Sequence, residues 1–206
     1  NIGLTYAKGK FITLLNNDTV TDQNWLKEII KPMLRDEQVG LCASLMINYY
    51  NCDVVDTAGD GYDICGVGYK IGEGEPVENH QQKKEVFGAC AGAALYRKSM
   101  IEKIGFFDEM FFAYGEDIDL SFRAKLAGYK CIYVPKAIVF HKVNQTMGTK
   151  SDFLVFHTRR NIEYTYFNNM PFLLLLLLLP FHILYNILTL IEALYNRKLS
   201  LFISSK

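Results

Sequence analysis

Near its C-terminus the chain carries no Asp, Glu, Lys or Arg between Glu163 and Glu192, and seven consecutive leucines occupy positions 173–179. A bilayer span needs roughly 20 apolar residues, so this stretch is long enough to cross a membrane. Three residues interrupt the apolar pattern, namely Pro180, His182 and Asn186. Because basic residues flank both ends, the positive-inside rule assigns no orientation.

The residues ahead of this stretch show the pattern of an α/β domain. Apolar runs without helical caps predict buried strands, and apolar positions three or four residues apart predict helices between them. We predict strands over 11–15, 39–47, 85–97, 130–134 and 137–140, and helices from Thr21 or Asp22 to Pro32, over 98–104 and over 115–128. A long loop over 51–84, with at most brief strands, and an aromatic loop over 106–114 complete this part.

The composition shifts after Met147 towards helices, which we predict over 151–168 and 171–196. We therefore divide the chain into an α/β domain over 1–150 and a helical, membrane-associating tail over 151–206. A core helix packed against the α/β domain is the alternative for the tail. The chain opens at Asn1 with neither a methionine nor a first strand, so we expect the first strands of the sheet to be missing.

Charge and cysteine content argue against several kinds of partner. Lysine plus arginine and aspartate plus glutamate number 22 each, so no global field attracts a polyanion, and nucleic acid is not an expected partner. The five cysteines form no C-x-x-C pair, so neither a disulfide framework nor a zinc site is indicated. Scattered cysteines of this kind are typical of a reducing compartment, and we expect the cytosol.

The first candidate site is Asn16-Asn17-Asp18, which follows the first predicted strand. An aspartate there presents its carboxylate at the crevice where α/β sheets bind ligands, and it can hold a divalent cation that bridges a diphosphate. An ordinary polar turn is the alternative. In the predicted strand over 85–97, small residues allow a ligand to approach the backbone closely, namely Gly88, Ala89, Gly92, Ala93 and Ala94.

The second candidate site is the first turn of the predicted helix over 115–128, which contains Glu116, Asp117 and Asp119. Acids at this position complement the helix macrodipole, which is a purely structural explanation. A carboxylate within hydrogen-bond reach of a sugar hydroxyl can instead serve as its base. His141, at the end of a predicted strand, is either a metal ligand or a polar strand terminus.

Several motifs, in this order, resemble glycosyltransferase family 2. They are Leu14-Leu15-Asn16-Asn17-Asp18, the strand ending in Tyr96-Arg97-Lys98, Gly105-Phe106-Phe107-Asp108-Glu109, Tyr114-Gly115-Glu116-Asp117-Ile118-Asp119-Leu120-Ser121-Phe122-Arg123, Ala127-Gly128-Tyr129, Val134-Pro135 with Ala137, His141, and Arg160-Asn161. The resemblance covers Asn1 to about Pro171 and is greatest to rhamnosyltransferase-like members. It implies a GT-A fold, that is, a mixed α/β sheet flanked by helices, here without its first strands and followed by an apolar helical segment.

The resemblance also implies roles for individual residues. Asp18 matches the last aspartate of the family's D-x-D motif, which contacts the metal on the donor diphosphate, and Asn16 stands where that motif has its first aspartate. Asp117 matches the catalytic base of the family's E-D motif. Glu116 is then a neighbour that positions the acceptor or the base.

The remaining implied contacts concern metal and donor. His141 falls where some relatives place a further metal ligand, and the implied cofactor is Mg²⁺ or Mn²⁺. Gly92 and Ala93 are the expected donor contacts on the small-residue strand.

The function implied is that of an inverting, metal-dependent glycosyltransferase. Its donor would be a nucleotide sugar such as dTDP-rhamnose, and its acceptor a glycan or a lipid-linked sugar in cell-surface polysaccharide synthesis. Because nucleotide sugars are cytosolic, we expect the chain at the cytoplasmic face of the cell membrane, where a kinked helix pair lies on the membrane or a single helix spans it.

Two other functions remain open from sequence. One is a sugar nucleotidyltransferase. That chemistry uses a glycine-rich phosphate loop followed by a basic residue, and the absence of such a loop from the sequence argues against it. The other is a catalytically inactive sugar-binding or membrane scaffold protein with the same fold. The intact Glu116-Asp117 pair argues against the scaffold.

Overall fold

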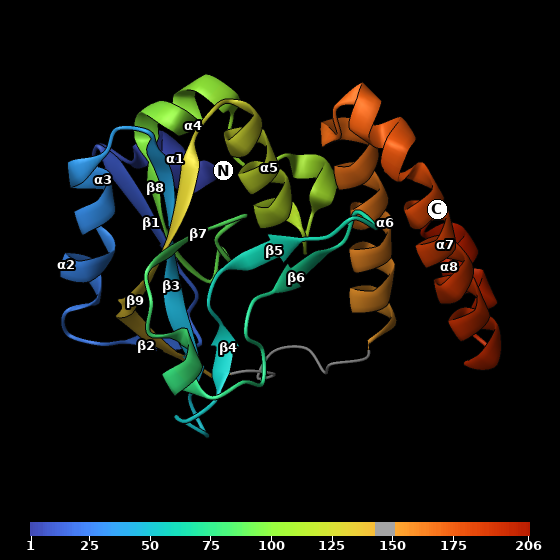
Figure 1. Ribbon diagram of the computed structural model, residues 1–206, viewed down its shortest axis with the longest axis horizontal. Coiled ribbons are helices and arrows are strands. Elements are labelled where there is room, and N and C mark those ends of the chain that lie inside the picture. Colours follow the sequence, from blue (N-terminus) through green and yellow to red (C-terminus); the bar gives the residue numbers. More distant parts are fainter. Residues whose placement is uncertain (143–150) are drawn as a thin grey trace.

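The computed structural model describes residues 1–142 and 151–206, and within them a mixed seven-stranded sheet lies at the centre of the α/β part (Figure 1). Five strands follow one another in the order β1-β8-β3-β9-β2, while β4 pairs with β3 and β7 pairs with β9. Strands β3 and β9 run parallel, and the other pairs are antiparallel. The strands are β1 (Phe11–Leu15), β2 (Thr19–Thr21), β3 (Val39–Asn48), β4 (Val55–Thr57), β7 (Lys84–Val86), β8 (Ala93–Arg97) and β9 (Lys130–His141).

Helices cover both faces of this sheet, and a further helical group lies beside it (Figure 1). The helices are α1 (Ile2–Tyr6), α2 (Trp25–Ile29), α3 (Lys31–Arg35), α4 (Lys98–Ile104), α5 (Glu116–Leu126), α6 (Asp152–Asn169), α7 (Phe172–Tyr195) and α8 (Leu199–Ser204), with single 3-10 turns at Val77–His80 and Glu109–Phe111. A hairpin of β5 (Asp60–Tyr62) and β6 (Gly68–Lys70) extends from the sheet towards α6 (Figure 1).

The central strand β3 explains why both faces of the sheet are covered. Its residues are apolar at nearly every position, and side chains alternate between the two faces of a strand. Leu41, Ala43 and Leu45 pack in the cluster that contains α4 and α5, whereas Cys42 and Met46 pack in the cluster that contains α2 and α3. The result is a three-layer arrangement in which the ends of the sheet strands remain available for a site.

The predicted strand over 85–97 is wrong as a single element. The structure divides it into β7, a loop over 87–92 and β8, and the two strands pair with different partners in the sheet. Gly88 explains the division, because its N–H donates to the carbonyl of Asp60 at 3.0 Å and its carbonyl accepts from the N–H of Asp60 at 2.9 Å. The chain therefore leaves the main sheet at this glycine to join the β5–β6 hairpin.

Proline accounts for two other corrections. The two strands predicted around Pro135 form the single strand β9, whose register against β3 shifts between the pairs Ser44–Val134 and Leu45–Ile138. This irregularity accommodates a residue that has no N–H for the ladder. The helix predicted to end at Pro32 is instead the two short helices α2 and α3, with Pro32 in the first turn of α3, where no N–H partner is needed.

The remaining predicted strands and helices of the α/β part are confirmed, including the brief strands within 51–84. Helices α1 and α8 and strand β2 have no counterpart among the sequence predictions. The predicted composition shift after Met147 and the domain boundary at residue 150 fall within 143–150, outside the described residues.

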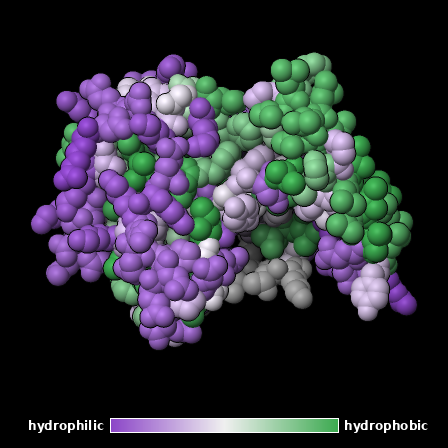
Figure 2. Space-filling view, viewed as in Figure 1, coloured by the Kyte–Doolittle hydropathy of each residue, from purple (hydrophilic) through white to green (hydrophobic). Residues whose placement is uncertain are grey.

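The two predicted tail helices are confirmed as α6 and α7, and α7 continues through Pro180. By length and composition α7 can cross a bilayer. One of its faces packs on the body through Leu175, Leu178 and Leu179, while most of its other apolar side chains are exposed. Figure 2 shows the hydrophobic side chains gathered over the C-terminal helices, in contrast to the mostly hydrophilic α/β part in this view. The described residues therefore do not enclose α7 as a core helix.

Candidate active site

A cavity of about 740 Å³ lies between the end of β1, the β5–β6 hairpin, the first turn of α5 and the helices α6 and α7. Asn16 and the pair Glu116-Asp117 all line it, although they are far apart in the sequence. Gly92 lines it too, from the loop before β8. The volume is that of a typical small-molecule site, so the structure brings several of the predicted site residues around one ligand-sized space.

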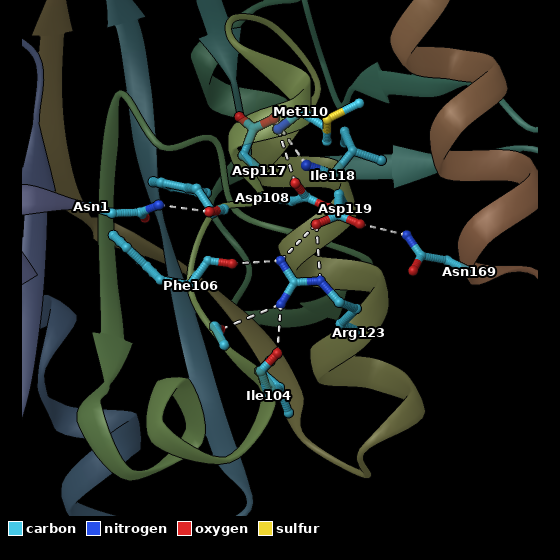
Figure 3. Close-up of polar contacts among 12 residues, drawn as sticks. Asn1, Ile104, Phe106, Asp108, Met110, Asp117, Ile118, Asp119, Arg123 and Asn169 are labelled. Atoms are coloured by element: carbon cyan, nitrogen blue, oxygen red, sulfur yellow. Dashed lines mark hydrogen bonds and ion pairs between the residues drawn. The ribbon is translucent and has the colours of Figure 1, made fainter.

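Asp117 is held at this cavity by backbone donors. Its Oδ2 accepts from the N–H of Ala91 at 3.2 Å. Its Oδ1 accepts from the N–H of Ile118 at 2.9 Å (Figure 3). Burial raises the pKa of Asp117, and the hydrogen bonds with Ala91 and Ile118 oppose that shift. A carboxylate with a raised pKa has a higher proton affinity, which suits a general base near neutral pH.

Glu116 is the neighbouring carboxyl in the cavity wall. Burial, and then the negative charge of Asp117, raise the pKa of Glu116 to about 7. Its Oε2 is buried without a hydrogen-bond partner among the described residues. Paired carboxyl groups whose environments shift their pKa values are typical of functional sites.

Asp119 differs from the other two acids of this turn. Its Oδ2 accepts from Arg123 Nε at 2.9 Å and Nη2 at 2.6 Å, and its Oδ1 accepts from Asn169 Nδ2 at 2.7 Å (Figure 3). The same Arg123 guanidinium donates to the carbonyls of Ile104 and Phe106. Asp119 therefore ties α5 to α6 and to the loop after α4, which makes its role structural.

The loop before α5 has an unusual backbone. Phe112 has φ 59° and ψ −57°, and the N–H of Ala113 donates to the carbonyl of Phe111 at 2.7 Å, which together form a γ-turn with positive φ. Tyr114 has φ 66° and Gly115 has φ 83°. Non-glycine residues in such conformations cost about 1–3 kcal/mol each and persist only where surrounding contacts hold them.

Those contacts come from α6. Asn161 is 1% exposed, and its Nδ2 donates to the carbonyls of Phe111 at 2.9 Å, Ala113 at 2.8 Å and Tyr114 at 2.6 Å. Arg160 Nη2 is a further side-chain donor to the carbonyl of Phe111, at 2.9 Å. Helix α6, which belongs to the predicted tail, thus fixes the loop that sets the position of the Glu116-Asp117 turn.

Asp18 lies beside the cavity and is connected to it by a row of charged side chains. Its Oδ2 is 3.4 Å from His141 Nε2, and His141 Nδ1 is 2.8 Å from Asp56 Oδ2. Asp56 Oδ1 accepts from Lys70 Nζ at 2.6 Å, and Lys70 lines the cavity. The hydrogen bond with Asp56 raises the pKa of His141. Although burial alone raises the pKa of Asp56, the contacts with His141 and Lys70 hold it below its usual range.

The two predicted donor contacts, Gly92 and Ala93, differ in their position relative to the cavity. Gly92 accepts a hydrogen bond from the N–H of Asn16 at 2.9 Å, and a Cβ on Gly92 would lie only 3.3 Å from Asn16 Nδ2. Because glycine has no side chain, the cavity stays open beside Asn16. Ala93 is 1% exposed and packs in the apolar cluster of α2 and α3, so its side chain is directed away from the cavity.

Comparison with known families settles the class of the chain. The profile of the family described as glycosyl transferase family group 2 matches residues 11–203, which is most of the chain. The chain belongs to this family.

Relatives within glycosyl transferase families include bacterial proteins of glycoconjugate synthesis. The chain is 38% identical over 71 residues to the N-acetylglucosaminyl-diphospho-decaprenol L-rhamnosyltransferase of Mycobacterium tuberculosis, covering 34% of this chain and 22% of that protein. It is 29% identical over 142 residues to the pre-mycofactocin glycosyltransferase of the same organism, covering 68% and 28%. It is 24% identical over 143 residues to the O-antigen biosynthesis protein RfbC of Myxococcus xanthus, covering 66% and 11%. The chain thus spans less than a third of these relatives.

Solved structures confirm the predicted GT-A fold. GalNAc-T7, solved with UDP, GalNAc and Mn²⁺, superposes with a TM-score of 0.61 at 17% identity, covering 80% of this chain and 32% of that one. The mannosyltransferase PcManGT from Pyrobaculum calidifontis, solved with GDP-Man and Mn²⁺, superposes with a TM-score of 0.53 at 12% identity, covering 99% and 63%.

Asp18 and His141, the metal ligands that the sequence predicts, lie side by side, with 3.4 Å between Asp18 Oδ2 and His141 Nε2. Within residues 1–142 and 151–206, no group of three or more His, Cys, Asp or Glu side chains is arranged as a metal site. However, Asp18 Oδ1 is buried without a hydrogen-bond partner among these residues. A hard divalent cation bound through one or two carboxylates, with phosphate and water as its other ligands, fits such an oxygen.

Several polar residues of this cavity received no role from the sequence, among them Asp60, Lys70 and Asn161. Asp60 and Lys70 line the cavity from the hairpin, and Asn161 lines it from α6. The glycines on either side of Asp60 are the signal for that residue, and the Arg160-Asn161 motif of the family resemblance is the signal for Asn161.

Proposed function

We propose that the chain carries the catalytic site of an inverting glycosyltransferase that moves a sugar from a nucleotide-sugar donor onto a hydroxyl of a glycan or lipid-linked acceptor. The observation that carries the proposal is the placement of Asp117, half-buried and of raised pKa, in a cavity that also contains Asn16 and Gly92. Membership of glycosyl transferase family group 2 supports the same reaction class.

The reaction is a single displacement in which Asp117 is the base. Its carboxylate takes the proton of the acceptor hydroxyl while the hydroxyl oxygen forms a bond to the anomeric carbon of the donor. The bond between that carbon and the diphosphate breaks on the opposite side, and the nucleoside diphosphate leaves. Attack opposite to the leaving group inverts the anomeric configuration.

Asp18 and His141 are the residues proposed to hold Mg²⁺ or Mn²⁺, with Asn16 as a donor contact. A bound divalent cation supplies charge neutralisation for the departing diphosphate. The unpartnered Oδ1 of Asp18 and the nearby Nε2 of His141 support this assignment. We propose rhamnose as the donor sugar, by similarity to a relative that is a rhamnosyltransferase, and cell-surface polysaccharide synthesis as the pathway.

A donor panel tests the proposal. We expect the full-length protein to release nucleoside diphosphate from one nucleotide sugar in a panel that includes dTDP-rhamnose, only with Mn²⁺ or Mg²⁺ present. Loss of a group that only supports a metal ligand already lowers metal affinity by about 10–100-fold. Because Asp18 is the proposed ligand itself, Asp18→Ala should weaken metal-dependent donor binding by at least about tenfold, measured by calorimetry. A wild-type protein that releases no nucleoside diphosphate from any donor supports the scaffold alternative, and an unchanged metal requirement in Asp18→Ala contradicts the metal assignment.

We further propose that the tail lies on the cytoplasmic face of the membrane with the exposed face of α7 in the lipid. Helix α6 packs beside α7, with an ion pair between Arg159 and Glu192 and a contact between Glu163 and His182. A spanning α7 would carry the charged groups of α6 into the hydrocarbon, which costs several kcal/mol. A helix pair lying at the interface keeps these groups at the polar level.

Vesicle binding tests this arrangement. Burial of one leucine side chain in lipid contributes about 1.5–3 kcal/mol to binding. The double variant Leu177→Glu with Leu188→Glu should therefore lower the fraction of protein bound to phosphatidylcholine–phosphatidylglycerol vesicles by about tenfold or more. Leu34→Glu is the matched control, since Leu34 and Leu177 are each 67% exposed but Leu34 lies on α3. Equal binding by the double variant argues against a lipid contact at this face, and resistance of the wild type to alkaline extraction identifies a span instead.

A further inference from the structure

Asp60 lines the cavity, but it is neither a proposed metal ligand nor the proposed base. It begins β5 and is fixed on both sides, because its backbone pairs with Lys70 of β6 in register and exchanges two hydrogen bonds with Gly88. It is 4% exposed. The backbone therefore holds this side chain in one place in the wall of the cavity.

One oxygen of the Asp60 carboxyl group has no hydrogen-bond partner within residues 1–142 and 151–206. This oxygen, Oδ2, is buried. Leaving such a group unpaired is costly, so a fold gains nothing from placing it here unless a ligand supplies the partner. Burial, together with the charge of Asp117, raises the pKa of Asp60 well above its usual range.

Unpaired polar atoms gather at this cavity. Tyr62 Oη and Glu116 Oε2 are also buried without partners, and both residues line the same cavity as Asp60. Three of the nine such side-chain atoms in the described residues thus belong to one ligand-sized space. Two carboxyls and a phenol present a set of hydrogen-bonding groups suited to adjacent hydroxyls of a sugar ring.

The groups of this wall favour one part of the substrates over another. Asp60, Glu116 and Asp117 offer carboxyl groups that can hydrogen-bond the hydroxyls of a neutral sugar ring, whereas Lys70, a cationic residue of the lining, is already bound to Asp56. The base Asp117 must lie within hydrogen-bond reach of the attacking hydroxyl, so the ring beside it is the acceptor's. We propose that Asp60 binds a hydroxyl of the acceptor sugar next to the attacking one and thereby determines which acceptor sugar is used. This inference rests on the proposed function.

The test uses the full-length protein, the donor that it accepts, and a panel of octyl glycosides of common hexoses, 6-deoxyhexoses and N-acetylhexosamines as acceptor probes. We expect Asp60→Ala to lower kcat/KM for the best octyl glycoside by at least about tenfold, mainly through the acceptor KM. The donor KM should stay unchanged, because Asp60 is proposed to contact the acceptor ring and not the donor. Asp60→Asn, which keeps the shape of the side chain, should show an intermediate loss.

Monodeoxy analogues of the best octyl glycoside identify the contact. Removal of the hydroxyl that Asp60 binds should lower kcat/KM of the wild type by about tenfold and leave Asp60→Ala nearly unaffected, since a site built to bind a hydroxyl rejects the analogue without it. Asp53→Asn, at an exposed acid of the 51–84 segment, should behave as wild type. If every analogue lowers kcat/KM equally in the wild type and in Asp60→Ala, or if a folded Asp60→Ala keeps the wild-type acceptor KM, the inference about Asp60 is wrong while the proposed function stands. A wild type that transfers to no acceptor overturns the proposed function with it.

Discussion

Asp117→Asn is expected to lower the rate of sugar transfer by about 10²–10⁴-fold while donor binding is retained, because general-base catalysis contributes an acceleration of that size. The amide has nearly the shape of the carboxylate, and its one oxygen can still accept from the N–H of Ala91 or of Ile118, so the first turn of α5 should stay folded. It cannot accept the proton of the acceptor hydroxyl. The measurement is kcat for transfer, with the donor dissociation constant measured separately.

Two further variants separate chemistry from structure at this turn. Asp53→Asn removes an exposed acid outside the cavity and should keep the wild-type kcat. Asp119→Asn should instead weaken the link of α5 to Arg123 and Asn169 and so lower the melting temperature. Full transfer activity in Asp117→Asn would remove the base assignment, and a loss of donor binding equal to the loss of rate would indicate a folding defect.

The parts of the fold that sequence reasoning predicted are those whose pattern is local. Strand β3 is apolar at nearly every position, and Asn16-Asn17-Asp18 follows a short apolar run, so each is visible within a few residues. The division of 85–97 was not predicted, because it depends on the pairing of Gly88 with Asp60 far away in the sequence. Strand β9 was split for the opposite reason, since Pro135 is a local signal that the shifted register against β3 overrides.

The candidate site shows the same limit. The Glu116-Asp117 pair is recognisable as a motif, and the structure places it beside Asn16 in one cavity. Asp60 and Lys70 lie in a segment whose composition indicates only a loop, and their place in the wall arises from the hairpin's docking against α6 and α7. His182 received no role from sequence, yet it stacks on Tyr166 at 3.9 Å and contacts the carbonyl of Cys65 at 2.7 Å, which holds α7 to that hairpin.

Loss of the Asn161 side chain is expected to have the second large effect, on stability and on turnover together. Asn161→Ala removes, from a place that is almost fully buried, the amide that donates to the carbonyls of Phe111, Ala113 and Tyr114, although the Phe111 carbonyl keeps Arg160 and the N–H of Ala113 as donors. The loss of a donor to a buried carbonyl costs about 1–3 kcal/mol, and partial relaxation or water entry reduces this cost. We therefore expect a fall of about 2–5 kcal/mol in the free energy of unfolding, measured by urea denaturation.

The effect on turnover follows from the backbone that Asn161 holds. Without the contacts of the Asn161 amide, the backbone at the positive-φ residues Phe112 and Tyr114 is held less firmly, and the turn that begins at Glu116 moves with it. Misplacement by about 1 Å can reduce a rate by about 10²-fold, so kcat should fall. The donor KM, which we propose is set at Asn16 and Asp18, should stay constant.

Asn161→Asp separates donor loss from cavity formation, because the side chain keeps its size but places a carboxylate against three carbonyl oxygens. It should therefore be at least as damaging as Asn161→Ala. The matched control is Asn168→Ala, an exposed asparagine on the same helix, which should leave both stability and kcat unchanged. If a folded Asn161→Asp keeps the wild-type kcat, helix α6 does not position the catalytic turn, and the γ-turn before α5 must be held by its own sequence.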